Sequence, residues 1–137
     1  MLAAFFLIFV SAIQAQDFTF VTSGGTNTLT FCSNTNSDIV IPDNYNGLPV
    51  TAIRDSVFYG DSNLTSIALG TNLAAIGYYV FLDCANFKAI TVSGQNTFLS
   101  SEDGVLFDKS KTTLLLYPVG RAGAYAIPKG VFAFSCV

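Results

Sequence analysis

The chain has 137 residues and a formal net charge of -3, with a sequence pI near 4.4. Its six Lys and Arg residues are scattered, which argues against nucleic acid as a partner because phosphate binding needs clustered basic side chains. The absence of His excludes the usual Ser-His and Cys-His nucleophile pairs and imidazole ligands for zinc. The length fits a single domain.

Residues 1–15 have the pattern of a secretory signal peptide. An unbroken apolar run from Leu2 to Val10 is followed by the small and polar residues 11–15, which suit cleavage after Ala15. A membrane anchor is the alternative, but a spanning helix needs about 20 apolar residues and this run is shorter. We therefore expect residues 16–137 to be the mature chain, secreted or at the cell surface.

Residues 16–38 are predicted to form a β-hairpin. Residues 18–21 and 28–31 alternate between apolar and polar side chains, and Gly24-Gly25 between them marks a turn. A hairpin at the end of a repetitive domain shields the first layer of its core, so we interpret this segment as an N-terminal cap.

Residues 50–92 repeat themselves at an offset of 23 residues. The paired positions are Val50 and Leu73, Ile53 and Ile76, Val57 and Val80, Phe58 and Phe81, Asn63 and Asn86, Leu64 and Phe87, Ile67 and Ile90, and Leu69 and Val92. A period of this length is typical of a solenoid, in which stacked units bury equivalent side chains in one continuous core.

Each unit carries an apolar-x-apolar triplet that predicts a short strand with one buried face. The triplets are Ile39-Val40-Ile41, Ile67-Ala68-Leu69 and Ile90-Thr91-Val92. The Val-Phe pair that precedes each bend is interpreted as a helical turn. Asn63 and Asn86 are expected to satisfy backbone groups at the bend.

The period breaks after Val92. Residues 96–124 are predicted to be a loop followed by a hairpin, with strands at 105–107 and 113–117. The triplet Tyr125-Ala126-Ile127 is expected to resume the repeat strand, in a unit that stops before it is complete. Its outer edge would then have unpaired backbone groups, which favours self-association through this C-terminal repeat.

Several motifs resemble the BspA-like leucine-rich repeats of bacterial secreted and surface proteins. They are Gly47-Leu48-Pro49-Val50-Thr51-Ala52-Ile53, Asp55-Ser56-Val57-Phe58-Tyr59-Gly60, Asn63-Leu64-Thr65-Ser66-Ile67, Ile76-Gly77, Val80-Phe81 and Asp83-Cys84. The stretch 101–107, with Leu116-Tyr117-Pro118 and Tyr125-Ala126-Ile127-Pro128, is similar to the hairpin insert of that family. The resemblance implies a mainly β, horseshoe-like solenoid with short helical turns over residues 39–137, a hairpin insert, and a ligand-binding or adhesive role.

The sequence offers little evidence for a catalytic site or a metal-binding site. Cys32, Cys84 and Cys136 are too dispersed for a metal site. We interpret Cys84 as a buried thiol, with a disulfide as the alternative. The adjacent acids Glu102 and Asp103 precede a Gly and are interpreted as turn residues rather than a catalytic dyad. Asn63 starts a glycosylation sequon, but we favour its structural role. We therefore predict no enzyme, no cofactor and no metal.

The middle residue of each strand triplet points away from the core. The resulting row of Val40, Ala68, Thr91 and Ala126 is small and nearly uncharged, and it is the predicted binding face for a protein or polysaccharide. Tyr45, Tyr59, Tyr78 and Tyr79 either add contact area or pack on neighbouring units, and we expect the packing. The alternative function is that of a passive repeat spacer, or of a fragment of a larger surface protein.

Overall fold

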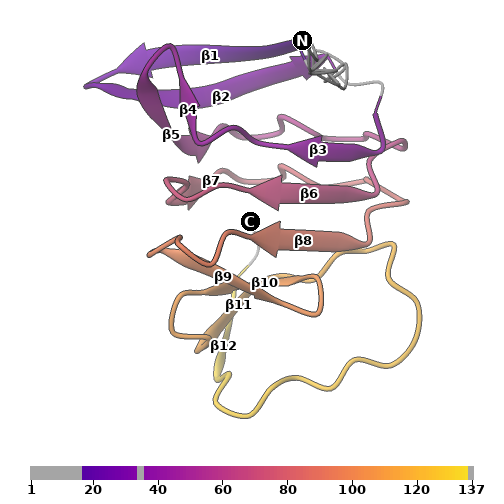
Figure 1. Ribbon diagram of the computed structural model, residues 1–137. Coiled ribbons are helices and arrows are strands. Elements are labelled where there is room, and N and C mark those ends of the chain that lie inside the picture. The colour runs from indigo at the N-terminus through magenta and orange to yellow at the C-terminus, as the bar shows by residue number, and fades with distance from the viewer. Residues whose placement is uncertain (1–16, 34–35, 136–137) are drawn as a thin grey trace, which may run out of the picture.

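The computed structural model describes residues 17–33 and 36–135, which form short strands and turns and contain no helix (Figure 1). The strands are β1 (Asp17–Ser23), β2 (Thr26–Ser33), β3 (Asp38–Val40), β4 (Asn44–Tyr45), β5 (Leu48–Ile53), β6 (Ser66–Leu69), β7 (Ala75–Ile76), β8 (Ala89–Val92), β9 (Leu99–Glu102), β10 (Val105–Asp108), β11 (Thr113–Leu116) and β12 (Ala133–Phe134). No described segment is a helix long and apolar enough to span a membrane.

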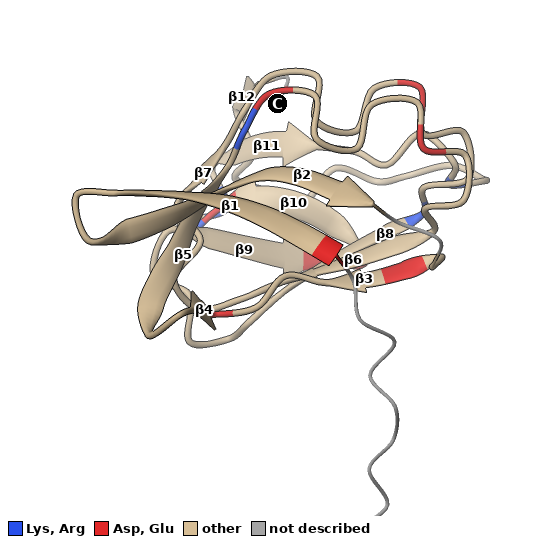
Figure 2. Ribbon diagram, turned by 90° about the horizontal axis from the view of Figure 1, so that it is seen from above, with Lys and Arg blue, Asp and Glu red and all other residues tan. Residues whose placement is uncertain are grey.

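The predicted repeat strands form one parallel sheet in the order β3-β6-β8. Ile67 lies opposite Ile90, as the 23-residue repeat predicts, and Ile39 lies opposite Ile67, so the first residues of the three apolar triplets are in register. Viewed from above, along the stack, these three strands lie close to one another at one side of the molecule (Figure 2). The predicted solenoid is confirmed.

A second set of parallel pairs joins β2 to β5 and β5 to β7. It was not predicted, because the apolar residues of this part of the repeat are three apart rather than two. In β5 only Val50 and Ile53 are fully buried. Backbone pairing between successive units therefore holds these short segments extended in spite of their side-chain spacing.

The predicted helical turns are wrong. Residues 55–60 and 78–83 form non-helical turns, in which Tyr59 N–H donates to Ser56 O and Leu82 N–H donates to Tyr79 O. Ser56 and Tyr79 have φ values of 60° and 58°. A right-handed helix needs negative φ throughout, so the chain cannot continue as a helix from these positions.

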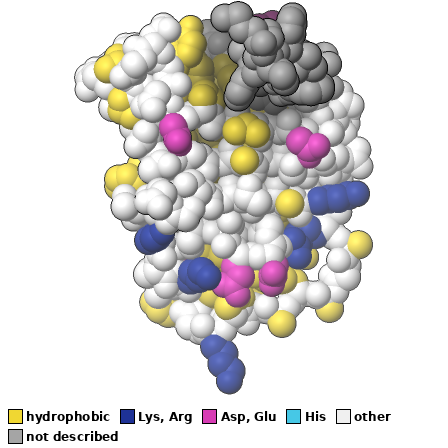
Figure 3. All heavy atoms as spheres, in the orientation of Figure 1, with side chains coloured by type: hydrophobic (Ala, Val, Ile, Leu, Met, Phe, Trp, Pro, Cys, Tyr) yellow, Lys and Arg dark blue, Asp and Glu magenta, His cyan; other side chains and the backbone are white. Residues whose placement is uncertain are grey.

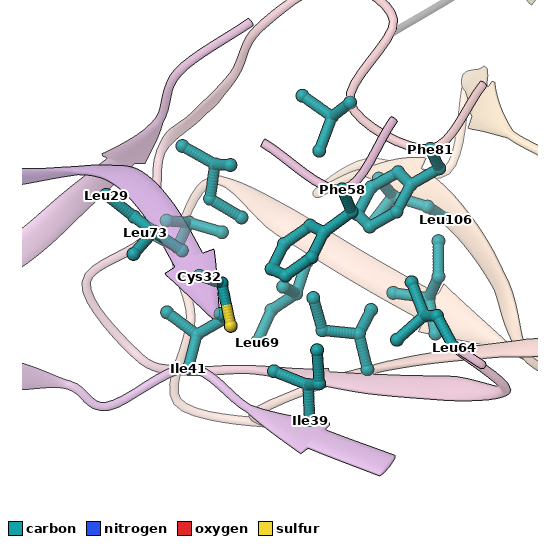
Figure 4. Packing of buried hydrophobic residues seen from close by; sticks show 14 of the residues in the cluster. Leu29, Cys32, Ile39, Ile41, Phe58, Leu64, Leu69, Leu73, Phe81 and Leu106 are labelled. Atoms are coloured by element: carbon teal, nitrogen blue, oxygen red, sulfur yellow. The ribbon is translucent and has the colours of Figure 1, made fainter. Parts of the chain in front are cut away.

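The core runs through the stack of units as one cluster of buried side chains. Phe58 and Phe81 stack with centroids 5.7 Å apart and an interplanar angle of 6°, and Phe87 stacks on Phe81 at 4.7 Å. Figure 4 shows Phe58 and Phe81 side by side above Leu64 and Leu69. The predicted equivalence of Phe58 and Phe81 is confirmed.

The N-terminal hairpin is present as predicted, with β1 and β2 antiparallel and Gly24 and Gly25 at positive φ in the turn. Leu29 and Cys32 of β2 are buried in the main core, and Phe18 and Phe20 pack against it. The hairpin therefore covers the first layer of the solenoid, as an N-terminal cap does.

The C-terminal part forms a sheet in the order β12-β11-β10-β9. The hairpin of β10 and β11 was predicted, whereas β9 lies in a stretch that was expected to be a loop. The strand expected at residues 125–127 is not formed, and Ile127 is 49% exposed. The β9–β10 turn already occupies the edge of β8, because Ile90 N–H donates to Gly104 O there.

Candidate binding surfaces

The predicted binding row is formed in part. Val40 lies opposite Ala68, and Ala68 opposite Thr91, on the parallel sheet. Val40 is 64% exposed, Thr91 is exposed and Ala68 is half-buried. Ala126 does not belong to this row, because it lies outside any strand. The face that carries these strands is mostly uncharged, with scattered hydrophobic side chains and a few charged ones (Figure 3).

Two acidic side chains near this row, those of Asp38 and Asp43, accept hydrogen bonds from residues of the next repeat unit. The Asp38 carboxylate accepts hydrogen bonds from Ser66 and Thr65, which lower its pKa. Asp43 accepts one from the backbone of Thr71. Among residues 17–33 and 36–135 no group of three His, Cys, Asp or Glu side chains could hold a metal ion.

Glu102 and Asp103 do not form a dyad. Glu102 is paired with Lys111 in an exposed salt bridge, while Asp103, with a φ of 51°, lies in the turn between β9 and β10. The prediction that they are turn residues is confirmed for Asp103. Glu102 is the last residue of β9, at the start of the same turn.

The two described cysteines, Cys32 and Cys84, are free thiols in the core. Burial, together with the negative charges of Asp61 and Asp17, raises the pKa of Cys32 to about 11. Burial also raises the pKa of Cys84, whose thiol donates to Phe58 O at 2.9 Å. Because the thiolate is the nucleophilic form, neither residue is suited to catalysis at neutral pH. The predicted buried thiol at Cys84 is confirmed, and Cys136 lies outside the described residues.

The prediction that the repeated asparagines satisfy backbone groups at the bend is confirmed for Asn86, whose side chain donates to Ser62 O. It is wrong for Asn63, because in the described part of the chain the bend N–H groups of Asn63 and Leu64 are satisfied by the Asp61 carboxylate and the Asn63 side chain forms no hydrogen bond.

Two buried asparagines were not predicted. Asn96 donates to Gly70 O and Leu73 O, and Asn27 donates to the carbonyls of two residues in the β4–β5 hairpin. Asn27 lies just before the predicted strand at residues 28–31, where an Asn is typical of a turn, so no local pattern indicated this role.

The expectation that the four tyrosines pack on neighbouring units is wrong for three of them. Tyr59, Tyr78 and Tyr79 are all more than half exposed. They belong to the turns at residues 55–60 and 78–83, and we call them the tyrosine surface. A hydrogen bond to the Asp83 carboxylate raises the pKa of Tyr59 and orients its hydroxyl. Tyr45 is also exposed, although its ring stacks on Phe20 at 4.5 Å.

An apolar groove of about 740 Å³ lies between the second turn and the C-terminal sheet. Residues between 79 and 87 line one wall, and residues 114–119 and 134–135 line the other. We call this feature the apolar groove. Its walls are more than 25 residues apart in the chain, so no local pattern predicted it. Only the folding of β11 against the last turn brings them together.

Comparison with known proteins identifies the repeat. The family model described as BspA type leucine rich repeat region (6 copies) matches residues 25–113, which is more than half of the chain. The chain belongs to the BspA-type leucine-rich repeat family. No curated protein matches its sequence.

Solved structures of other leucine-rich repeat proteins are similar in fold to this chain. A leucine rich cell surface protein from Faecalibacterium prausnitzii aligns with a TM-score of 0.53 and 26% identity, over 58% of this chain and 23% of the other. The T. pallidum leucine rich repeat protein aligns with a TM-score of 0.54 and 22% identity, over 58% of this chain and 38% of the other. A leucine-rich repeat protein from Eubacterium ventriosum aligns with a TM-score of 0.52 and 16% identity, over 85% of this chain and 53% of the other. In each case the match spans less than two thirds of the other chain.

Proposed function

We propose that this BspA-type repeat protein is a secreted or cell-surface binding module that performs no catalysis and takes a protein or a polysaccharide as its ligand. The proposal rests first on the tyrosine surface, where Tyr59, Tyr78 and Tyr79 expose most of their side chains. Membership of the family and the likeness to a protein described as a leucine rich cell surface protein support the surface location.

Exposed tyrosines suit this role for a physical reason. A tyrosine ring offers a large, rigid contact area with few rotatable bonds, and its hydroxyl adds a hydrogen bond at the edge. Tyr78 and Tyr79 lie with ring centroids 6.5 Å apart, so they form one aromatic surface rather than two separate contacts. A sugar ring or an apolar side chain of a partner can pack on such a surface.

The strand row of Val40, Ala68 and Thr91 is the second candidate surface. It is flat because the three residues are in register across parallel strands, and it is nearly uncharged. A flat and weakly polar face accepts an extended ligand without the cost of burying charge.

The test is a glycan array together with a screen of secreted and surface proteins, using the full chain. A ligand that binds the unchanged chain is then measured with Tyr78→Ser and with Val40→Ser. If the tyrosine surface carries binding, Tyr78→Ser weakens the affinity at least about tenfold and Val40→Ser leaves it within about twofold. The opposite result assigns binding to the strand row.

A passive spacer is the alternative function. It predicts that no ligand binds reproducibly in either screen, or that every ligand binds the two variants as well as the unchanged chain. Either outcome contradicts the proposed binding role.

A further inference from the structure

The two turns of residues 55–60 and 78–83 are stacked by backbone hydrogen bonds. The N–H groups of Ser56, Phe58 and Gly60 donate to the carbonyls of Tyr78, Val80 and Leu82, at 3.0, 3.1 and 2.9 Å. The donors are two residues apart, as are the acceptors. The second turn therefore pairs with the first in the manner of a parallel strand, although neither has regular strand geometry.

The two turns have the same backbone conformation. Ser56 and Tyr79, which are equivalent in the 23-residue repeat, have φ values of 60° and 58°, and Gly60 and Asp83 have values of 71° and 62°. The N–H groups of Tyr79, Phe81 and Asp83 consequently point in the direction in which those of Ser56, Phe58 and Gly60 point. That direction leads away from the first turn and toward the apolar groove.

These three N–H groups have no acceptor. Within the described part of the chain no hydrogen bond from the backbone N–H of Tyr79, Phe81 or Asp83 is formed. All three residues line the apolar groove. The groove thus continues the interface between the two turns, because it presents the donors of a third layer beside the exposed side chain of Leu82. Among residues 17–33 and 36–135 no backbone carbonyl accepts from these donors.

We propose that the apolar groove binds an extended peptide segment that carries a phenylalanine or another large apolar residue. The carbonyls of residues i, i+2 and i+4 of this peptide accept hydrogen bonds from the backbone N–H groups of Tyr79, Phe81 and Asp83. Its apolar side chain packs on the exposed apolar lining of the groove, which includes Leu82, Val119 and Phe134. This is binding by addition of a strand, in which backbone hydrogen bonds supply affinity and a side-chain pocket supplies specificity.

The size and lining of the groove agree with this occupant. A volume of about 740 Å³ is within the range of sites that enclose a ligand of a few residues. The opposite wall is apolar and includes two exposed side chains, Val119 (65% exposed) and Phe134 (66% exposed). One turn of this wall is held in place because Gly120 N–H donates to Phe87 O at 2.7 Å.

The peptide site shares Tyr79 with the tyrosine surface, but Tyr78 and Val40, which test the proposed function, do not line the groove. The variants that test the two proposals therefore change different residues, and the two proposals can fail independently.

The probe is the acetylated and amidated pentapeptide SVFYG, which copies residues 56–60 of this chain. If the peptide pairs with the second turn in the same register in which the second turn pairs with the first, the carbonyls of its acetyl group, Val and Tyr accept hydrogen bonds from the N–H groups of Tyr79, Phe81 and Asp83. The peptide is uncharged, and the same peptide with Ala in place of Phe is the control probe.

Binding is measured by isothermal titration calorimetry of the peptide into the full chain, and by the amide resonances of the ¹⁵N-labelled protein. We expect the amides of Tyr79, Phe81 and Asp83 to shift and to exchange more slowly when the peptide binds. Those of Ser56, Phe58 and Gly60 already have acceptors and should show no added protection. The Ala peptide should bind at least about tenfold more weakly.

Val119→Asp and Val40→Asp form a matched pair of variants, because both valines are about equally exposed and only Val119 lines the groove. Val119→Asp should weaken peptide binding at least about tenfold, and Val40→Asp should change it by less than about twofold. Phe134→Ala is a second groove variant, and it should also weaken peptide binding. It replaces Val119→Asp in the comparison if that variant fails to fold.

Three outcomes would overturn the proposal. The first is no shift of the three amides at any peptide concentration. The second is equal peptide affinity of the Val119→Asp and Val40→Asp variants. The third is protection of the three amides without peptide that increases with protein concentration, which would show that a second copy of the chain fills the groove.

Discussion

At the scale of single residues, the stack of Phe58 on Phe81 should contribute strongly to stability. Replacing either by Ala removes a buried ring and leaves a cavity, which costs about 3 to 5 kcal/mol of the free energy of unfolding. Phe132→Ala is the control, because that ring is exposed and its removal should cost less than about 0.5 kcal/mol. Urea unfolding of the three variants measures these differences. Equal costs for Phe81→Ala and Phe132→Ala would contradict the packing described here.

Asp108 is a second residue with a measurable role, because its carboxylate closes the turn between β10 and β11. Partial burial alone would raise its pKa, but hydrogen bonds from Ser110, Thr112 and the backbone of Thr113 outweigh that effect and lower it to about 2. A pKa lowered by folding stabilises the native state above the unfolded value, and this contribution is lost as the pH falls through the folded value.

We therefore expect Asp108→Asn to be less stable than the unchanged chain at pH 7. The difference should shrink as the pH falls below about 3.8 and should be small near pH 2, where about half of the native aspartate is protonated. Urea midpoints at pH 7, 4 and 2 measure it. Asp103→Asn, in the exposed β9–β10 turn, is the control and should have little effect. A difference that is the same at all three pH values would contradict a role for the charge.

At the scale of elements, the contact of the β9–β10 hairpin with β8 depends on one glycine. Gly104 has a φ of 76°, and a Cβ at this position would lie 3.2 Å from both Cα and Cβ of Ala89 and closer still to the Arg121 guanidinium. Gly104→Ala therefore strains the turn and separates the hairpin from β8.

We expect Gly104→Ala to lower the free energy of unfolding by about 1 to 3 kcal/mol. Gly94→Ala is the matched control, since a Cβ at Gly94 meets nothing within 4 Å and its φ is not positive. Thermal and urea unfolding compare the two variants. Equal stability of the two would contradict the close contact at Gly104.

At the scale of the whole molecule, export stays a prediction, because residues 1–16 lie outside the described part. The apolar run followed by small residues predicts that the expressed chain leaves the cytoplasm and loses its first fifteen residues. Mass spectrometry of the secreted and membrane fractions checks this. Recovery of a chain that begins with Met1 from the membrane fraction would favour the anchor.

Self-association through the C-terminal repeat also stays a prediction, but its structural premise has changed. The edge strand expected to begin near Ile127 is not formed, and β12 pairs with β11 instead. In the described part of the chain, backbone N–H groups without an acceptor are found instead at the second turn, where they line the apolar groove. The strand that would have been exposed to other copies is therefore absent.

The 23-residue period by itself determined the solenoid, the register of β6 and β8, and the stacking of Phe58 on Phe81, and the matching apolar triplet at residues 39–41 predicted β3. Repeated apolar positions predict these features because each unit can bury its side chains only against an equivalent unit. Local alternation and the Gly24-Gly25 turn likewise predicted the hairpin of β1 and β2. These features depend on the order of side chains within one or two units, which a sequence shows directly.

Tertiary structure alone decided the rest. β9 forms a hairpin with β10, and the turn of this hairpin pairs with the edge of β8. Residues 125–127 were expected to pair with that edge, and because they do not, Ala126 is not part of the predicted binding row. The tyrosines became exposed because positive φ at Ser56 and Tyr79 shaped the turns that present them. The apolar groove exists only because β11 packs against a turn distant in sequence. Competition for one strand edge and contact between distant segments are properties of the folded chain, and no local pattern records them.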